Sequence, residues 1–82
     1  MKSEVMRYEV LVRSKPEVLD PEARAIHETL NRLGMKELKG VEVSRRFLLE
    51  LEGPESNDKA KEIATKYLAN PVSEVFTVQA LK

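Results

Sequence analysis

Hydrophobic and polar residues alternate near the start of the chain. The apolar positions share one parity and are Met6, Tyr8, Val10 and Val12. A period of two is typical of a strand with one buried face. Leu11 lies on the opposite face, so we expect that face to be partly covered. The segment 14–17, which contains a proline, ends the predicted strand.

An apolar stripe with helical spacing follows, and its members are Ala23, Ile26, Leu30 and Leu33. Asp20 precedes the stripe and can accept hydrogen bonds from the first free backbone N–H groups of a helix. Pro21 suits the first helical position, where its missing N–H costs nothing. Gly34 can take the left-handed conformation that often ends a helix. The pattern predicts a helix over residues 21–33.

The segment 41–51 is apolar at every odd position except Arg45. Two interpretations fit this pattern. A three-residue loop over 44–46 makes a hairpin that keeps the parity and pairs Val43 with Phe47. However, the loop has no Gly, Asn or Asp to take a positive φ. One long bent strand is the alternative.

A second helical stripe lies between residues 56 and 70, with apolar residues at Ala60, Ile63, Ala64, Tyr67 and Leu68. Ser56, Asn57 or Asp58 can cap this helix. Asn70 and Pro71 end it, because a residue before proline is disfavoured in the helical region. Residues 72–81 then form the last strand, with Phe76, Val78 and Ala80 on one face.

The predicted order is β-α-β-β-α-β over a single domain of residues 1–82. It favours an α+β fold of the ferredoxin-like kind, in which two helices cover one face of an antiparallel sheet in two layers.

Composition narrows the choice of function. Lysine and arginine balance aspartate and glutamate at 14 each, so the chain lacks the positive field of a nucleic-acid or anionic-membrane binder. No apolar run approaches the roughly 20 residues of a membrane span. We expect a cytoplasmic protein that contacts neither nucleic acid nor membrane. With 82 residues and no cysteine, it lacks disulfide staples, and oligomerisation is the stabiliser that remains.

Residues that often carry chemistry are sparse. His27 is the only histidine, it falls mid-helix, and no cysteine accompanies it as a nucleophile. The glycines at 34, 40 and 53 are dispersed, unlike those of a phosphate-binding loop. We expect His27 to pack or face solvent, and the glycines to serve turns.

Two charged sets are candidates for a site. Glu42, Glu50 and Glu52 share one parity and could form a carboxylate or hard-cation site, although a solvated sheet face is the simpler interpretation. Arg45 and Arg46 form a basic pair at the predicted turn and could hold a phosphate or a partner carboxylate. RNA-binding modules share this element order, but the segment 46–51 lacks their stacking aromatics. The residues alone thus favour a binding or assembly role without naming it.

Three segments carry a resemblance to a known family: Val18-Leu19-Asp20-Pro21-Glu22, the helix end Leu30-Asn31-Arg32-Leu33-Gly34, and Leu68-Ala69-Asn70-Pro71-Val72-Ser73-Glu74. They resemble PurS, the small subunit of phosphoribosylformylglycinamidine synthase. The resemblance runs from about residue 8 to residue 78. The chain departs from the family in having Glu17 where a glycine is usual, and Ser44-Arg45 where Gly-Lys is frequent, which affects the expected turn geometry.

The resemblance implies a role in purine biosynthesis. The complete enzyme converts formylglycinamide ribonucleotide, glutamine and ATP into formylglycinamidine ribonucleotide, and is therefore a glutamine-hydrolysing, ATP-dependent C–N ligase. In such a complex a large synthetase subunit binds ATP and magnesium, and a glutaminase subunit releases ammonia. The small subunit is expected to have no catalysis and no cofactor of its own, to form homodimers or homotetramers, and to bridge the other two subunits and aid ammonia transfer.

Alternative functions remain at this point: a small-ligand-sensing regulatory dimer of similar fold, and a small enzyme that uses the three glutamates. For the assembly role, we expect the segment 41–51 to drive self-association, with the two arginines near the contact. The candidate interface or structural residues are Leu19, Asp20, Pro21, Arg45, Arg46, Leu49, Asn70 and Pro71.

Overall fold

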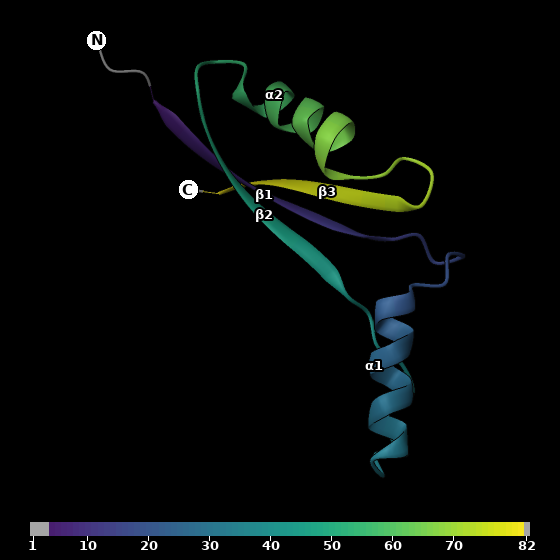
Figure 1. Cartoon of the computed structure of the whole chain (residues 1–82). Helices are drawn as coiled ribbons and strands as arrows, with labels where there is room; N and C mark the ends of the chain where they lie inside the picture. Colours follow the sequence, from purple (N-terminus) through teal and green to yellow (C-terminus); the bar gives the residue numbers. More distant parts are fainter. Residues whose placement is uncertain (1–3, 82) are drawn as a thin grey trace.

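Three antiparallel strands form one sheet in the order β2-β1-β3. The computed structural model describes residues 4–81. Its elements, in chain order, are β1 (Val5–Ser14), α1 (Pro21–Arg32), β2 (Ser44–Glu52), α2 (Ser56–Ile63), the π-helical turn η1 (Ala64–Leu68) and β3 (Glu74–Leu81). Figure 1 shows α2 lying over the sheet and α1 projecting from one end of it. The predicted α+β plan with an antiparallel sheet is confirmed, and it is consistent with a ferredoxin-like arrangement.

Strand β1 is the central strand, and its alternation decides which face is buried. Val10 pairs with Phe47 of β2 and Val78 of β3, so one parity of all three strands shares a face. Val10 and Val12 are 0% and 1% exposed. The alternation predicted from the sequence is therefore confirmed, and the last strand also presents Phe76 and Val78 on the predicted face.

Helix α2 and η1 cover this inner face and complete the core. The core consists of Val10, Val12 and Ala64, and partly buried residues pack around it: Phe47, Leu49, Leu68, Ala69, Phe76 and Val78. A buried hydrogen bond of 2.6 Å joins the Tyr8 hydroxyl to the Ser56 Oγ and so ties the first turn of α2 to the central strand. Burial of apolar area is the main source of stability in such a layer.

The start of α2 differs from the expectation. Ser56 is the first helical residue, and Glu55 occupies the cap position without a side-chain hydrogen bond. The predicted cap by Ser56, Asn57 or Asp58 is therefore wrong, because the Ser56 hydroxyl turns inward to Tyr8. At the other end, the extra residue in the π turn shifts the helical register, and Tyr67 is 76% exposed rather than part of the buried stripe.

The four-strand order is wrong for the single chain, because the hairpin at 44–46 does not form. Residues from Ser44 to Glu52 make one continuous strand, and no residue other than glycine has a positive φ in the described part of the chain. Pairing with β1 ends where Arg13 meets Ser44. Residues 41–43 therefore continue past the sheet, which is the long-strand alternative.

Local capping of α1 agrees with the sequence. The Asp20 carboxylate accepts hydrogen bonds from the backbone N–H groups of Glu22 and Ala23, at 3.0 and 3.4 Å. Pro21 occupies the first helical position. At the other end, Gly34 has a φ of +105°, and the backbone N–H groups of Gly34 and Met35 bond back to carbonyls of the last turn. The helix ends at Arg32, one residue earlier than predicted.

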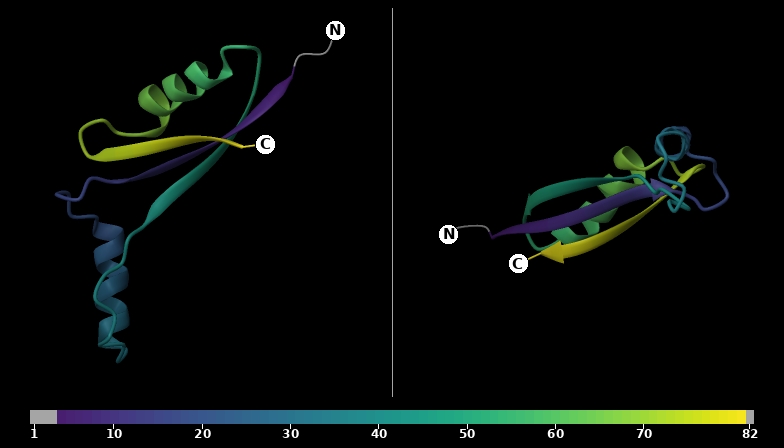
Figure 2. Two further views of the ribbon diagram at one scale, coloured as in Figure 1. Left: turned by 180° about the vertical axis from the view of Figure 1, so that it is seen from behind. Right: turned by 90° about the horizontal axis from the view of Figure 1, so that it is seen from below.

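The position of α1 differs from the predicted plan of two helices on one sheet face. Helix α1 lies off the end of the sheet, and the chain returns beside it toward β2 (Figures 1 and 2). The two parts of this arm (residues 15–43) are joined by the Leu38 carbonyl oxygen, which contacts His27 Nε2 at 3.0 Å and Asn31 Nδ2 at 3.3 Å. The molecule is consequently elongated, with extents of 59 × 26 × 13 Å.

Candidate interaction site at one end of the sheet

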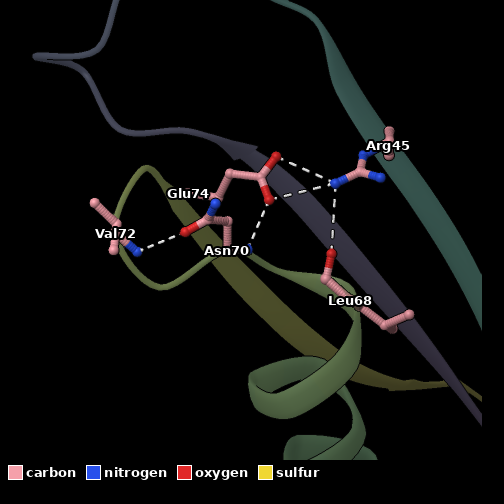
Figure 3. A network of polar contacts seen from close by, with 5 residues as sticks. All are labelled: Arg45, Leu68, Asn70, Val72 and Glu74. Carbon is pink, nitrogen blue, oxygen red and sulfur yellow. Dashed lines mark hydrogen bonds and ion pairs between the residues drawn. The ribbon is translucent and has the colours of Figure 1, made fainter.

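Arg45 connects three segments at the end of the sheet from which the arm projects (Figure 3). Its Nη2 lies 3.1 and 3.3 Å from the two carboxylate oxygens of Glu74 and 3.4 Å from the Leu68 carbonyl oxygen. The guanidinium also lies 5.6 Å from the centre of the Phe47 ring. The Asn70 backbone N–H donates to Glu74 Oε1 at 2.8 Å. Arg45 thereby links β2 to the end of η1 and the start of β3.

The loop between η1 and β3, the NPV loop (residues 69–73), is held by its own hydrogen bonds. Asn70 Oδ1 accepts from the Val72 N–H at 2.9 Å, and the Asn70 carbonyl accepts from the N–H groups of Ser73 and Glu74. The Lys15 N–H donates to the Ser73 carbonyl at 2.9 Å, which joins this loop to the one that follows β1. Asn70 therefore shapes the turn as well as ending the helix.

Residues from two of the segments that carry the family resemblance, 18–22 and 68–74, meet at this end. A small hollow of about 130 Å³ is lined by Asp20 of the first segment, Glu74 of the second and Arg45 of β2. Asp20 is engaged as the cap of α1, whereas Leu19 beside it is 77% exposed. Pro71 is exposed in the NPV loop. Residues that are far apart in the sequence thus form one surface.

A larger groove of about 520 Å³ lies between α1 and residues 40–43. Apolar side chains of Val18, Ala23, Val41 and Val43 line it together with charged residues such as Arg24, Glu28 and Glu42. The single histidine also lines it, with its ring against the Leu38 carbonyl. In residues 4–81, no group of three or more His, Cys, Asp or Glu side chains is placed to hold a metal ion.

Two candidate residues lie away from this site. Arg46 is on the outer face of the sheet, where its guanidinium pairs with Glu9. Leu49 pairs with Tyr8 and is partly buried on the inner face of the sheet, where it packs against the core. The two arginines, expected to meet glutamates of another chain, each pair with a glutamate of this one.

The three candidate glutamates are dispersed. Glu50 and Glu42 lie 3.7 Å from Arg7 and Arg13 respectively, and both ion pairs are solvent-exposed. Glu52 is exposed at the end of β2. The arrangement is that of a solvated sheet face, the simpler of the two interpretations.

The sequence analysis missed Glu74 as a site residue, although it lies within the third segment quoted for the resemblance. An acidic residue four positions after Asn70 was the available signal, because a carboxylate there can accept from the Asn70 N–H. Its second partner, Arg45, is 29 residues away in sequence and could be found only from the fold.

The arm exposes much apolar surface. Leu19 and Leu33 are 77% and 70% exposed, and Met35 and Ile26 are 45% and 38% exposed. Within residues 4–81, the backbone of residues 40–43 makes no hydrogen bond to another backbone group. The arm is therefore a helix and an extended segment that contact each other and lie outside the sheet of their own chain. No helix in the described part of the chain is long and apolar enough to cross a membrane.

Comparison with known proteins identifies relatives of this chain. The sequence profile of the PurS family, described as phosphoribosylformylglycinamidine (FGAM) synthase, matches residues 7–82. The phosphoribosylformylglycinamidine synthase subunit PurS of Methanocaldococcus jannaschii is 35% identical over 77 residues, which are 89% of this chain and 92% of the relative.

Solved structures share the fold. The crystal structure of Methanocaldococcus jannaschii PurS, one of the subunits of formylglycinamide ribonucleotide amidotransferase, matches with a TM-score of 0.81 at 30% identity, covering 94% of this chain and 96% of that one. A chain in the structure of PurLQS from Thermotoga maritima has the same fold, with a TM-score of 0.83 at 22% identity and coverage of 95% and 99%.

Proposed function

We propose that this chain is the small subunit that bridges the glutaminase and the large synthetase subunits of phosphoribosylformylglycinamidine synthase. The chain belongs to the PurS family of that enzyme. The chain is a subunit of a glutamine-dependent, ATP-using ligase of purine biosynthesis. The family match over nearly the whole chain carries this assignment. It replaces the alternatives of a ligand-sensing dimer and of a small independent enzyme.

The chemistry of the site supports a non-catalytic role. The residues that converge at the end of the sheet are an engaged cap, an ion pair and a loop, and the one histidine ring contacts a backbone carbonyl. None of these groups is arranged as a nucleophile with a base. We assign ATP and magnesium to the large subunit, and ammonia release to the glutaminase subunit. The complex acts in the cytoplasm.

The arm supports self-association of the chain. A ferredoxin-like layer has four strands and two helices, whereas this sheet has three strands and one covering helix. The arm holds one extended segment and one amphipathic helix that are outside the sheet. Because β2 is continuous from Ser44, residues 40–43 cannot fold back beside it within the same chain.

A second copy of the chain offers a strand edge and a sheet face on which the arm can pack. Strand β2 is at the edge of the sheet, and an unpaired edge is a template for another strand. Residues 40–43 of each copy pair with β2 of the other, and each α1 covers the inner face that α2 leaves partly exposed at Leu49 and Leu51. Such a reciprocal contact has two-fold symmetry, the commonest in homo-oligomers. A dimer is the smallest assembly that satisfies both arms.

Reconstitution tests the proposed function. The chain is mixed with purified glutaminase and synthetase subunits of the same source, with and without glutamine and magnesium-ATP, and the complexes are separated by size. We expect the chain to copurify with both subunits and to raise glutamine-dependent activity, and to have no activity alone. A chain that neither enters the complex nor changes its activity contradicts the proposal.

A further inference from the structure

We propose that the chain forms a domain-swapped dimer with residues 44–46 as its hinge. In such a dimer the arm makes on a second copy the contacts that it would make on its own sheet if the hinge were a turn. The inference rests on the proposed function and deepens its self-association. It names the residues that pair between the copies and the contacts that keep the hinge extended.

The apolar pattern on the two sides of the hinge is that of the two strands of a hairpin. Val41 and Val43 precede the hinge and are partly buried in the groove of the arm. Phe47 and Leu49 follow it with the same parity and pack on the core. A turn over 44–46 would pair Val43 with Phe47. Val41 would then face Leu49, also on the inner face. With an extended hinge, the same two pairs form between copies.

The sheet holds the hinge extended. Each of residues 44–46 pairs with a residue of β1, and these three pairs form one end of the β1–β2 ladder. A turn would remove all three from the sheet. It would also displace Arg45, which donates to the Glu74 carboxylate at 3.1 Å, and Arg46, which pairs with Glu9 on the outer face. The extended hinge keeps contacts that a hairpin gives up.

The hinge sequence also disfavours a turn. A three-residue hairpin loop places its last residue in the left-handed region, where glycine is preferred. That residue is Arg46, whose Cβ is sterically disfavoured in this conformation. In the described part of the chain, only Gly34 and Gly53 have a positive φ. A short loop that is strained when closed favours exchange of the element beside it between copies.

The arm is built to exchange as one unit. The Leu38 carbonyl oxygen lies 3.0 Å from His27 Nε2 and accepts from Asn31 Nδ2 at 3.3 Å, which attaches the returning segment to α1. Figure 2 shows the two side by side, away from the sheet. On a second copy, residues 40–43 extend the sheet at the β2 edge, and α1 lies on its inner face. Each half then has the four strands and two helices of a ferredoxin-like layer.

This pairing places the two-fold axis of the dimer beside Arg45, which is midway between Val43 and Phe47. The two copies of Arg45 then face each other, and like charges directly opposite on paired strands are destabilising. Glu74 of the same chain lies against each guanidinium and neutralises it, with its side chain only 22% exposed. The Arg45–Glu74 ion pair therefore supports the dimer as well as the extended hinge.

Arg46→Gly tests the hinge, because glycine removes the steric cost of the turn. Arg46→Ala is the matched control, since it loses the same side chain and the same ion pair to Glu9 but keeps the Cβ. We expect glycine to favour the closed chain about tenfold. Both chains of a dimer close, so the dissociation constant should rise about a hundredfold. Arg46→Ala should change it less than about threefold. Sedimentation equilibrium of the full chain provides the measurement.

Amide hydrogen exchange distinguishes a closed monomer from a dimer that has only separated. The amides of residues 41–43 should stay protected in monomeric Arg46→Gly, because the hairpin pairs them within the chain. Unprotected amides there would contradict closure. Equal dissociation constants for Arg46→Gly and Arg46→Ala also overturn the inference.

The pairing itself is measured on the wild-type chain, by isotope-filtered NMR of a mixture of labelled and unlabelled copies. We expect contacts of Val43 with Phe47 between copies in the wild type. A wild-type dimer that lacks these contacts overturns the inference, whatever the variants do. A monomeric wild-type chain contradicts the dimer and the inference with it. Failure to copurify with the glutaminase and synthetase subunits contradicts only the bridging role.

Discussion

Helices α1 and α2 both carry an apolar stripe, but only α2 packs against the sheet of its own chain. Ala60 and Ala64 of the α2–η1 segment are fully buried, whereas on α1 only Ala23 is buried and Ile26 remains 38% exposed. The capping signals at the helix ends rank the two helices in the opposite order. Helix α1 has a side-chain cap and a glycine stop, and α2 has no side-chain hydrogen bond at its cap.

The difference shows that local and tertiary stabilisation are separable in this chain. Helix α1 satisfies its terminal backbone groups by itself, so it can persist while it projects from the sheet. Helix α2 spans eight residues before the π turn and depends on the core beneath it, because short helices are marginal without packing.

The largest expected effect separates the two faces of β2. Leu49→Glu places a carboxylate against the core, and we expect a loss of about 2 kcal/mol or more in the free energy of unfolding. Leu48→Glu is the matched control, because Leu48 is 40% exposed on the outer face, and we expect a change within about 0.5 kcal/mol. Denaturant unfolding of both variants provides the measurement. Equal losses would show that the faces are not distinguished as described.

The next effect concerns the stripe of α1. Ile26→Glu introduces a charge into the surface proposed to cover a second copy, and we expect the dissociation constant of self-association to rise about tenfold. Ala25→Glu is the control, since Ala25 is exposed and lies outside the stripe. Sedimentation equilibrium measures the mass of each variant. A dimer that tolerates Ile26→Glu as well as Ala25→Glu would contradict the proposed role of the arm.

The caps of the two helices provide a smaller contrast. Asp20→Ala removes a side chain that accepts two backbone N–H groups, and we expect a loss of about 0.5–2 kcal/mol in helix stability. Glu55→Ala removes a side chain that caps nothing and should change stability by less than about 0.5 kcal/mol. Amide hydrogen exchange in the first turn of each helix is the measurement. If Glu55→Ala accelerated exchange in the first turn of α2 more than Asp20→Ala does in the first turn of α1, the assignment of the caps would be contradicted.

The smallest effect is a titration on the outer side of α2. Hydrogen bonds from the ammonium groups of Lys66 and Lys59 hold the pKa of the Glu62 carboxyl below its ordinary value of 4.5. A carboxyl group whose pKa is lower in the folded state stabilises the fold at pH values above its unfolded pKa. This contribution is lost as the pH falls through the pKa of the folded state. Lys66→Ala should raise the pKa of Glu62 in an NMR titration, without a measurable change in melting temperature at pH 7.

The candidate site was predictable only in part. Asp20, Pro21, Asn70 and Pro71 were found because caps and helix stops depend on neighbours within a few residues. Arg45 was found as a charged residue, but its partner was not, since Glu74 lies 29 residues away. Val72 was wrongly assigned to the last strand, because an alternating pattern assigns a valine to a strand, while the Asn70 turn places it in a loop.

The sequence by itself determined the elements of this protein. The alternation in β1, the cap and stop of α1 and the family resemblance all depend on residue type at short range, where backbone geometry and hydrogen bonding are decided locally. Only the tertiary structure decided that residues 44–52 form one strand and that α1 leaves the sheet. A hairpin and a straight strand satisfy the same apolar parity, so the choice between them depends on which surfaces are available for burial. In the proposed dimer these include the surfaces of a second copy.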